Sequence, residues 1–136
     1  EAAELLSMVV ERVPGHVGAL HNLSRVLIQL GKREEALSVM GQFSAMSELR
    51  DEIDFNAFAV RKNPDNIEGR LQLSSLYLRA GRTQDALTEL HATRALAPRN
   101  ARIYRMLGTA YRRLGDENSA VRAERFATTL EGAANG

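Results

Sequence analysis

The sequence of 136 residues contains no cysteine, no tryptophan and only 5% aromatic residues. Without cysteine the chain cannot form disulfides, use a thiolate nucleophile or bind a metal through sulfur. The redox compartment therefore stays open, and both the bacterial cytoplasm and the periplasm remain candidates. No apolar run approaches the roughly 20 residues that a membrane-spanning helix needs, so we expect a soluble protein with no membrane insertion. The scarcity of aromatic residues, with abundant Ala, Leu, Arg and Glu, favours helices over strands.

A large net charge is also lacking, because 18 Lys and Arg stand against 17 Asp and Glu. A net charge of +1 is too near balance to imply nucleic acid or a membrane surface as a partner from the total alone. All the basic residues except Lys32 and Lys62 are arginines, which fits either a GC-rich genome or a need for bidentate contacts with anions, and we favour the genome. The arginines are concentrated near one end, since residues 99–125 hold seven Arg against three acidic residues. An acidic partner would favour that part of the chain.

Turn-forming residues recur at fixed intervals. The three prolines, at positions 14, 64 and 98, are separated by 50 and 34 residues, and the glycines Gly31, Gly81 and Gly115 have the same two separations. Between these positions apolar residues recur every three or four residues, as in amphipathic helices. Glycine suits the end of a first helix, proline prevents continuation of a second, and Asn66 and Asn100 can cap the helices that follow. Each unit is therefore predicted to be a helix pair.

A helix-turn-helix unit with a period of 34 residues resembles the tetratricopeptide repeat family. The third unit places residues on the family's positions 4, 7, 8, 11, 20 and 27: Tyr104, Leu107, Gly108, Tyr111, Ala120 and Ala127. The second unit offers the matches Leu73, Ser74, Tyr77, Ala86, Leu90 and Pro98, and the first offers Leu20, Leu23, Ser24, Leu27, Ala36 and Met40. The second unit departs from the pattern with Arg70 at position 4 and Thr93 at position 27.

The resemblance implies an all-α fold: a helical-repeat solenoid of antiparallel helix pairs, which binds other proteins and does not catalyse a reaction. Neither helix of a pair can bury its apolar side alone, so each unit packs against its neighbours. We expect the following organisation: second helix of a truncated repeat at 1–14, repeat 1 at 15–47, helical insertion at 48–63, repeat 2 at 64–98, repeat 3 at 99–131, and a disordered tail at 132–136.

The separation of 50 residues exceeds the period by 16, so an insertion interrupts the repeats at residues 48–63. This stretch has no Gly, its apolar spacing continues that of the preceding helix, and we predict one extended helix over about residues 34–62. A break near Ser47, which could cap a new helix, is the alternative. A continuous helix would expose apolar residues for self-association into a homodimer: Leu49, Ile53, Phe55, Phe58 and Val60. The alternative is that the following repeats fold back over them.

In the resembled family, first-helix residues line a concave groove that binds a protein or peptide. The partner-binding residues implied here are His21, Asn22, Arg25, Gln72, Ser75, Arg79, Arg102, Arg105, Thr109 and Arg112. An acidic peptide would suit the arginines, although a solvated helix face is the competing interpretation. Family members that clamp the acidic tail of heat-shock chaperones have a set of residues of which only Arg102 is chemically close here.

No constellation of residues indicates catalysis, a cofactor or a metal. The three histidines, His16, His21 and His91, lack the spacing of a metal-ligand pair on a helix. There is no nucleophile motif, phosphate loop or glycine fingerprint. Two alternatives to a protein-binding scaffold stay open: a nucleic-acid contact through the Arg-rich third repeat, and a regulatory arm of a larger enzyme.

Overall fold

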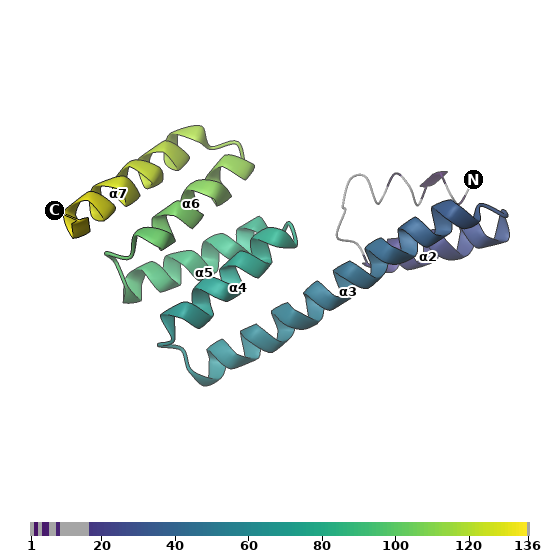
Figure 1. Cartoon of the computed structure of the whole chain (residues 1–136), viewed down its shortest axis with the longest axis horizontal. Coiled ribbons are helices and arrows are strands. Elements are labelled where there is room, and N and C mark those ends of the chain that lie inside the picture. Colours follow the sequence, from purple (N-terminus) through teal and green to yellow (C-terminus); the bar gives the residue numbers. More distant parts are fainter. Residues whose placement is uncertain (1, 3, 6–7, 9–16, 136) are drawn as a thin grey trace. The chain divides into compact units, whose positions relative to one another are not determined.

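The computed structural model describes residues 2, 4–5, 8 and 17–135, and residues 17–135 form six helices and no strand (Figure 1). The expected all-α class is therefore confirmed. Most of the helix expected at residues 1–14 lies outside the described residues. The bounds of the helices are α2 (Val17–Gln29), α3 (Arg33–Lys62), α4 (Ile67–Arg79), α5 (Thr83–Leu96), α6 (Ala101–Arg113) and α7 (Glu117–Asn135).

The chain divides into two compact units, residues 1–52 and residues 53–136. The boundary falls within α3, which is one continuous helix of 30 residues. The alternative of a break near Ser47 is therefore wrong, because this helix has no Gly or Pro after Gly41 to interrupt it. Within the second unit, α4, α5, α6 and α7 lie in chain order, each packed against the next (Figure 1).

A glycine in the left-handed conformation ends the first helix of each pair. Gly31, Gly81 and Gly115 have φ angles of 76°, 75° and 82°. The residue after each glycine donates its backbone N–H to a carbonyl five residues back, at 2.9, 2.8 and 2.9 Å. This is the arrangement that satisfies the last carbonyls of a helix, and it turns the chain back to start the second helix. The recurring glycines of the sequence predicted this way of ending the first helices.

Asparagine caps begin the next pairs, as expected. The side-chain oxygen of Asn66 accepts a hydrogen bond from the backbone nitrogen of Gly69 at 3.1 Å, and that of Asn100 accepts one from Arg102 at 3.0 Å. At the other end, α7 continues to Asn135 and so includes residues 132–135, where a disordered tail was expected. Two alanines in that stretch favour the helix enough to offset the single Gly132.

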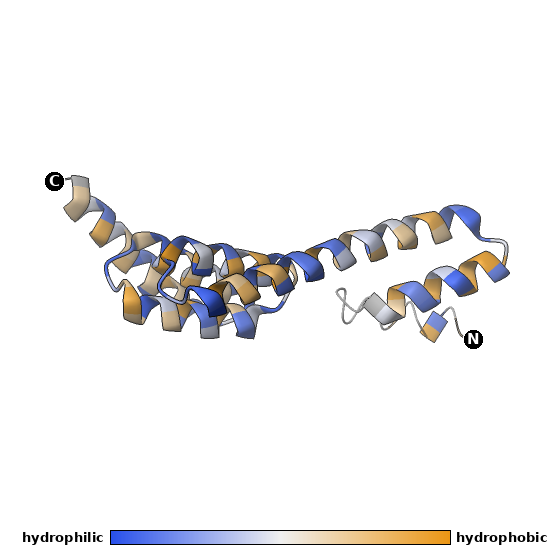
Figure 2. Cartoon of the chain, turned by 90° about the horizontal axis from the view of Figure 1, so that it is seen from below, coloured by the Kyte–Doolittle hydropathy of each residue, from blue (hydrophilic) through white to orange (hydrophobic). Residues whose placement is uncertain are grey.

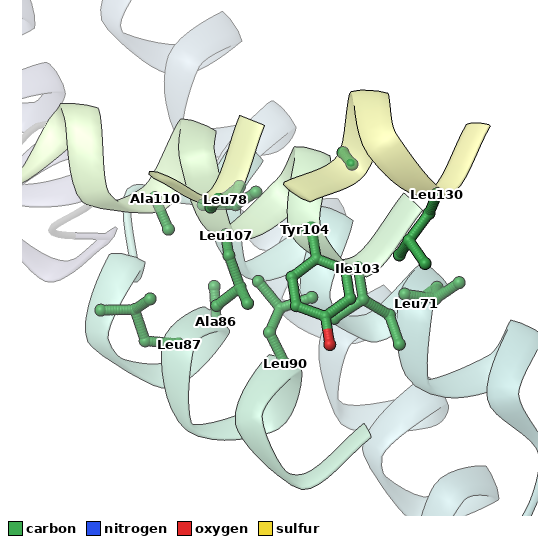
Figure 3. Packing of buried hydrophobic residues seen from close by; sticks show 12 residues of the cluster. Leu71, Leu78, Ala86, Leu87, Leu90, Ile103, Tyr104, Leu107, Ala110 and Leu130 are labelled. Carbon is green, nitrogen blue, oxygen red and sulfur yellow. The ribbon is translucent and has the colours of Figure 1, made fainter. Parts of the chain in front are cut away.

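The second unit has a continuous hydrophobic core, in which leucines of α4 and α5 meet apolar residues of α6 and α7 (Figure 3). Ala86 and Ala120 are both fully buried, since small residues allow the paired helices to approach closely. Leu90 and Ile103 are also 0% exposed. Hydrophobic and hydrophilic residues are interspersed along the helices, as expected where helices bury one side (Figure 2).

The first unit has a smaller core formed by α2 and the beginning of α3. Leu23 and Leu27 of α2 cluster with Ala36 of α3, and Val26 and Val39 pack at the edge. Ala36 occupies the repeat position of Ala86 and Ala120 and is likewise buried, at 1% exposure. The same small residue therefore marks the helix crossing in all three expected repeats.

Candidate partner-binding surface

All ten predicted partner-binding residues are exposed to solvent. His21, Asn22 and Arg25 belong to α2 of the first unit, whereas the other seven belong to α4 and α6 of the second. In the first unit the ring of His21 packs against Phe43 of α3, with 5.2 Å between ring centroids. The predicted set is therefore divided between the two units.

The first helices of repeats 2 and 3 lie next to each other and are joined by side chains. Arg102 of α6 forms an ion pair with Glu68 of α4, with a nitrogen–oxygen distance of 2.6 Å. Arg113, near the end of α6, donates a hydrogen bond from its guanidinium to the backbone carbonyl of Leu78. These two contacts tie the N-terminal and C-terminal ends of α4 and α6 together, and so define one exposed surface across the two helices.

We call this surface the α4/α6 face. Its exposed polar side chains are Glu68, Gln72, Ser75, Arg79, Arg102, Thr109 and Arg113. The side chains of Gln72, Ser75 and Arg79 form no hydrogen bond or ion pair with any residue in the described part of the chain. They are therefore free to bind a partner without first losing an internal contact.

Arg113 was absent from the predicted set, although the repeat spacing could have found it. It lies 34 residues after Arg79 and so occupies the same repeat position. Its bond to the carbonyl of Leu78, the residue before Arg79, brings its guanidinium to the same end of the face. Two arginines therefore belong to the C-terminal end of the α4/α6 face, where the partial negative charges of two helix ends also lie.

Arg105 and Arg112 lie on a different surface from the one expected. Their counterparts one period earlier, Leu71 and Leu78, are 1% and 8% exposed and belong to the core shared with α6. The positions of Arg105 and Arg112 thus correspond to the side of repeat 2 that packs on repeat 3, rather than to the open face. Both are exposed because no described helix covers that side of repeat 3.

We call this second surface the outer face of repeat 3, and ion pairs cover much of it. Arg105 pairs with Glu131 at 2.5 Å and also donates to the Thr128 hydroxyl at 3.1 Å, while Arg112 binds both Glu117 and Glu124. The carboxylates raise the pKa of Arg112 above its ordinary value through hydrogen bonds. A hollow of about 510 Å³ is lined there by Arg105, Val121, Glu124, Arg125, Thr128 and Thr129.

The two units differ in charge. Residues 53–136 contain thirteen Arg and Lys against nine Asp and Glu, whereas residues 1–52 contain five against eight. The second unit is thus positive by four charges and the first is negative by three. Five of the second unit's twelve arginines form ion pairs with described residues, so part of this positive charge is already neutralised locally.

Two tetratricopeptide repeat models match the sequence, at residues 17–43 and 71–127. The chain belongs to the tetratricopeptide repeat family. The first segment contains Gly31 and the second contains Gly81 and Gly115, and together the two segments cover more than half of the chain. A search of curated proteins gives no match.

Several solved structures have a similar fold. A crystal structure of MamA covers 98% of this chain and 88% of its own, with a TM-score of 0.62 and 19% identity. A structure described as YrrB, "a TPR protein with an unusual peptide-binding site", covers 96% of this chain and 76% of its own, with a TM-score of 0.60 and 14% identity. In several other MamA structures the chain spans about two thirds of the length.

The departure from the tetratricopeptide pattern at position 4 has a structural explanation. Tyr104 of repeat 3 donates its hydroxyl to the carbonyl of Pro98 at 2.7 Å, and Arg70 of repeat 2 donates its Nε to the carbonyl of Pro64 at 2.6 Å. Each side chain reaches six residues back to the proline that precedes its helix. The Arg70 guanidinium also pairs with Glu89 at 2.9 Å, with both side chains about 15% exposed. Arginine therefore replaces the aromatic residue without losing this bond.

Three of the five residues predicted for self-association are buried within the chain itself. Leu49, Ile53 and Val60 are 7%, 2% and 8% exposed, so the expectation that they face solvent was wrong. They recur at helical spacing on one side of α3, and that side is covered by the chain's own residues. Phe55 and Phe58 are exposed, as expected.

His91 is the one histidine of the second unit, and it serves packing. Its Nε2 lies 3.1 Å from the Tyr111 hydroxyl, while its Nδ1 is buried without a partner among the described residues. Burial, together with the charge of Arg94, lowers the pKa of His91, so the ring is neutral at pH 7. The described residues contain no group of three or more His, Asp or Glu placed to hold a metal ion. None of the helices they form is long and apolar enough to cross a membrane.

Proposed function

We propose that the second unit is a non-catalytic scaffold that binds an acidic segment of another protein along the α4/α6 face. The observation that supports this most is the row of exposed polar side chains on two adjacent first helices, three of which form no hydrogen bond or ion pair with a described residue. Tetratricopeptide repeats bind proteins through their first helices, and YrrB is described as having a peptide-binding site. An extended segment lying across both helices could bond to Gln72, Ser75 and Thr109.

The partner's negative charge would bind at the C-terminal end of the face, where the two guanidinium charges outweigh the partial negative charges of about half a unit at each helix end. Arg79 forms no ion pair with a described residue, and Arg113 donates only to a backbone carbonyl. Neither guanidinium therefore has to break an existing ion pair before it binds a carboxylate of the partner. A guanidinium offers paired donors to a carboxylate, which makes such contacts stronger than those of neutral groups. Arg102, in contrast, would have to exchange Glu68 for the partner, although this exposed ion pair costs little to break.

The test is the affinity of the whole chain for a short fluorescent peptide rich in Asp and Glu, measured by fluorescence anisotropy. We expect replacement of both Arg79 and Arg113 by Ala to weaken binding by about tenfold or more, since charged hydrogen bonds are each worth roughly 1.5–3 kcal/mol. Arg122, which is exposed on α7 and is not part of the α4/α6 face, offers the matched control, and its replacement by Ala should leave the affinity unchanged.

Two results would count against the proposal. Equal losses from Arg79→Ala and Arg122→Ala would mean that the peptide responds to total charge and not to the α4/α6 face. Tighter binding of an oligonucleotide than of the peptide, with a steep dependence on salt, would favour a nucleic-acid contact instead. We expect weak oligonucleotide binding, because five of the unit's arginines already have carboxylate partners.

A further inference from the structure

The exposed side of α3 presents two phenylalanines. Phe55 is 73% exposed, the highest value for a large hydrophobic side chain among the described residues, and Phe58 is 52% exposed. At about 100° per residue, Phe58 lies roughly 60° around the helix from Phe55, whereas the buried Ile53 lies roughly 160° away. The two rings therefore share the side of α3 that faces away from its buried side. Burying two such rings would be favourable.

Opposite charges flank the two phenylalanines at equal distances. Asp51 precedes Phe55 by four residues, and Lys62 follows Phe58 by four residues. The four residues follow the helical spacing of a single stripe and, with α3 continuous throughout, they lie on one side of it. Lys62 also leans over the ring of Phe58, with its Nζ 5.3 Å from the ring centroid. Neither charged group forms an ion pair with a described residue.

We propose that this stripe, Asp51–Phe55–Phe58–Lys62, binds the same stripe of a second copy of the chain in an antiparallel arrangement. Because the stripe is symmetric about its midpoint, a twofold axis there places Phe55 against the partner's Phe58 and Asp51 against the partner's Lys62. Both ends then carry opposite charges across the interface. A parallel arrangement would instead place Asp51 against Asp51 and Lys62 against Lys62, with repulsion at both ends.

The charge pattern is what selects a second copy as the occupant. A stripe meant for an unrelated partner has no reason to be complementary to itself under a twofold rotation. The stripe spans twelve residues, with a rise of about 16 Å along the helix, and it is smaller than interfaces that form permanent dimers. We therefore expect a reversible dimer with a dissociation constant on the order of 100 μM. The proposal does not depend on the peptide-binding function of the α4/α6 face.

The first experiment is sedimentation equilibrium of the whole chain from low micromolar to millimolar concentration. We expect a reversible shift of the mass from monomer to dimer. Replacement of both phenylalanines by Ala should weaken dimerisation at least tenfold, with unchanged helical circular dichroism because both side chains are exposed. Leu114 is 46% exposed at a site remote from the stripe in sequence, and Leu114→Ala is the matched control that should dimerise normally.

Charge reversal tests the antiparallel arrangement. Asp51→Lys alone and Lys62→Asp alone should each weaken the dimer, since both ends of the interface then oppose like charges. The double variant D51K/K62D should restore wild-type dimerisation, because the two charges exchange places and each end of the interface again pairs opposite charges. A monomer mass up to millimolar concentration, an unchanged dimer after loss of both phenylalanines, or no rescue by the double variant would each overturn the proposal.

Discussion

The partly buried ion pair between Arg70 and Glu89 allows a quantitative test of how repeat 2 is held together. The two side chains are 15% and 16% exposed, so Glu89→Ala removes an anion from beside a guanidinium that water reaches poorly. Breaking a buried ion pair lowers stability by about 3–5 kcal/mol, whereas breaking a surface ion pair lowers it by about 0–1 kcal/mol. This pair lies nearer the buried case, and we expect a loss of about 2–3 kcal/mol.

Repeat 3 indicates the substitution that should compensate. There, the residues equivalent to Arg70 and Glu89 are Tyr104 and Ala123, and the tyrosine hydroxyl makes the same bond to the preceding proline carbonyl. The double variant R70Y/E89A would therefore place repeat 3's pair in repeat 2. We expect its unfolding free energy to lie within about 1 kcal/mol of the wild type, since replacing both partners of a buried polar pair can be nearly neutral.

The assay is urea unfolding of the whole chain followed by circular dichroism. Asp85→Ala provides the control, because its ion pair with Arg82 is 46% and 51% exposed and should contribute less than about 1 kcal/mol. Equal small losses for Glu89→Ala and Asp85→Ala would refute the burial argument. A double variant as unstable as Glu89→Ala alone would show that tyrosine cannot replace arginine at this position.

Three further predictions concern the core, the turns and the effect of pH. Leu90→Ala should lower the unfolding free energy, measured in urea, by about 2–5 kcal/mol, because Leu90 is 0% exposed and its truncation leaves a cavity. A loss below about 1 kcal/mol would contradict the packing described. Gly81→Ala should lower the unfolding free energy by about 1–2 kcal/mol, because φ is +75° there although no neighbouring atom would clash with the added methyl group. Gly41→Ala, in the middle of a helix and with open space around it, should be neutral or stabilising. Thermal unfolding of the two variants measures both effects. The pKa of His91 is lowered in the folded chain, so the unfolded chain binds a proton at higher pH, and the stability of the fold should fall as the pH drops below 6.5. His91→Gln should reduce that loss of stability between pH 7 and 5. A stability profile unchanged by the substitution would exclude His91 as the cause.

The sequence predicted the helix pairs well because their signals are local. The periodic Gly and Pro positions fix where each helix ends, and Asn66 and Asn100 supply caps whose chemistry depends only on neighbouring residues. The continuity of α3 also followed from local information, since its residues favour helix and none of those after Gly41 is a breaker.

Predictions about surfaces were weaker because they depend on which helices pack together. Leu49, Ile53 and Val60 form an apolar stripe, and the pattern alone could not tell whether the chain or a second copy covers it. Arg105 and Arg112 occupy positions that are open or covered depending on the neighbouring repeat. Comparison of repeat 3 with repeat 2 resolves this point, since Leu71 and Leu78 are buried at the same positions.

A residue-by-residue map of binding tests most directly whether the α4/α6 face binds an acidic segment. Backbone amide chemical shifts of the labelled chain would be recorded by NMR during titration with the peptide rich in Asp and Glu. We expect the largest changes along α4 and α6, centred near Ser75, Arg79 and Thr109, with little change around Val121 and Arg125 on the outer face of repeat 3. Changes concentrated on the outer face, or spread evenly over all exposed arginines, would contradict this expectation.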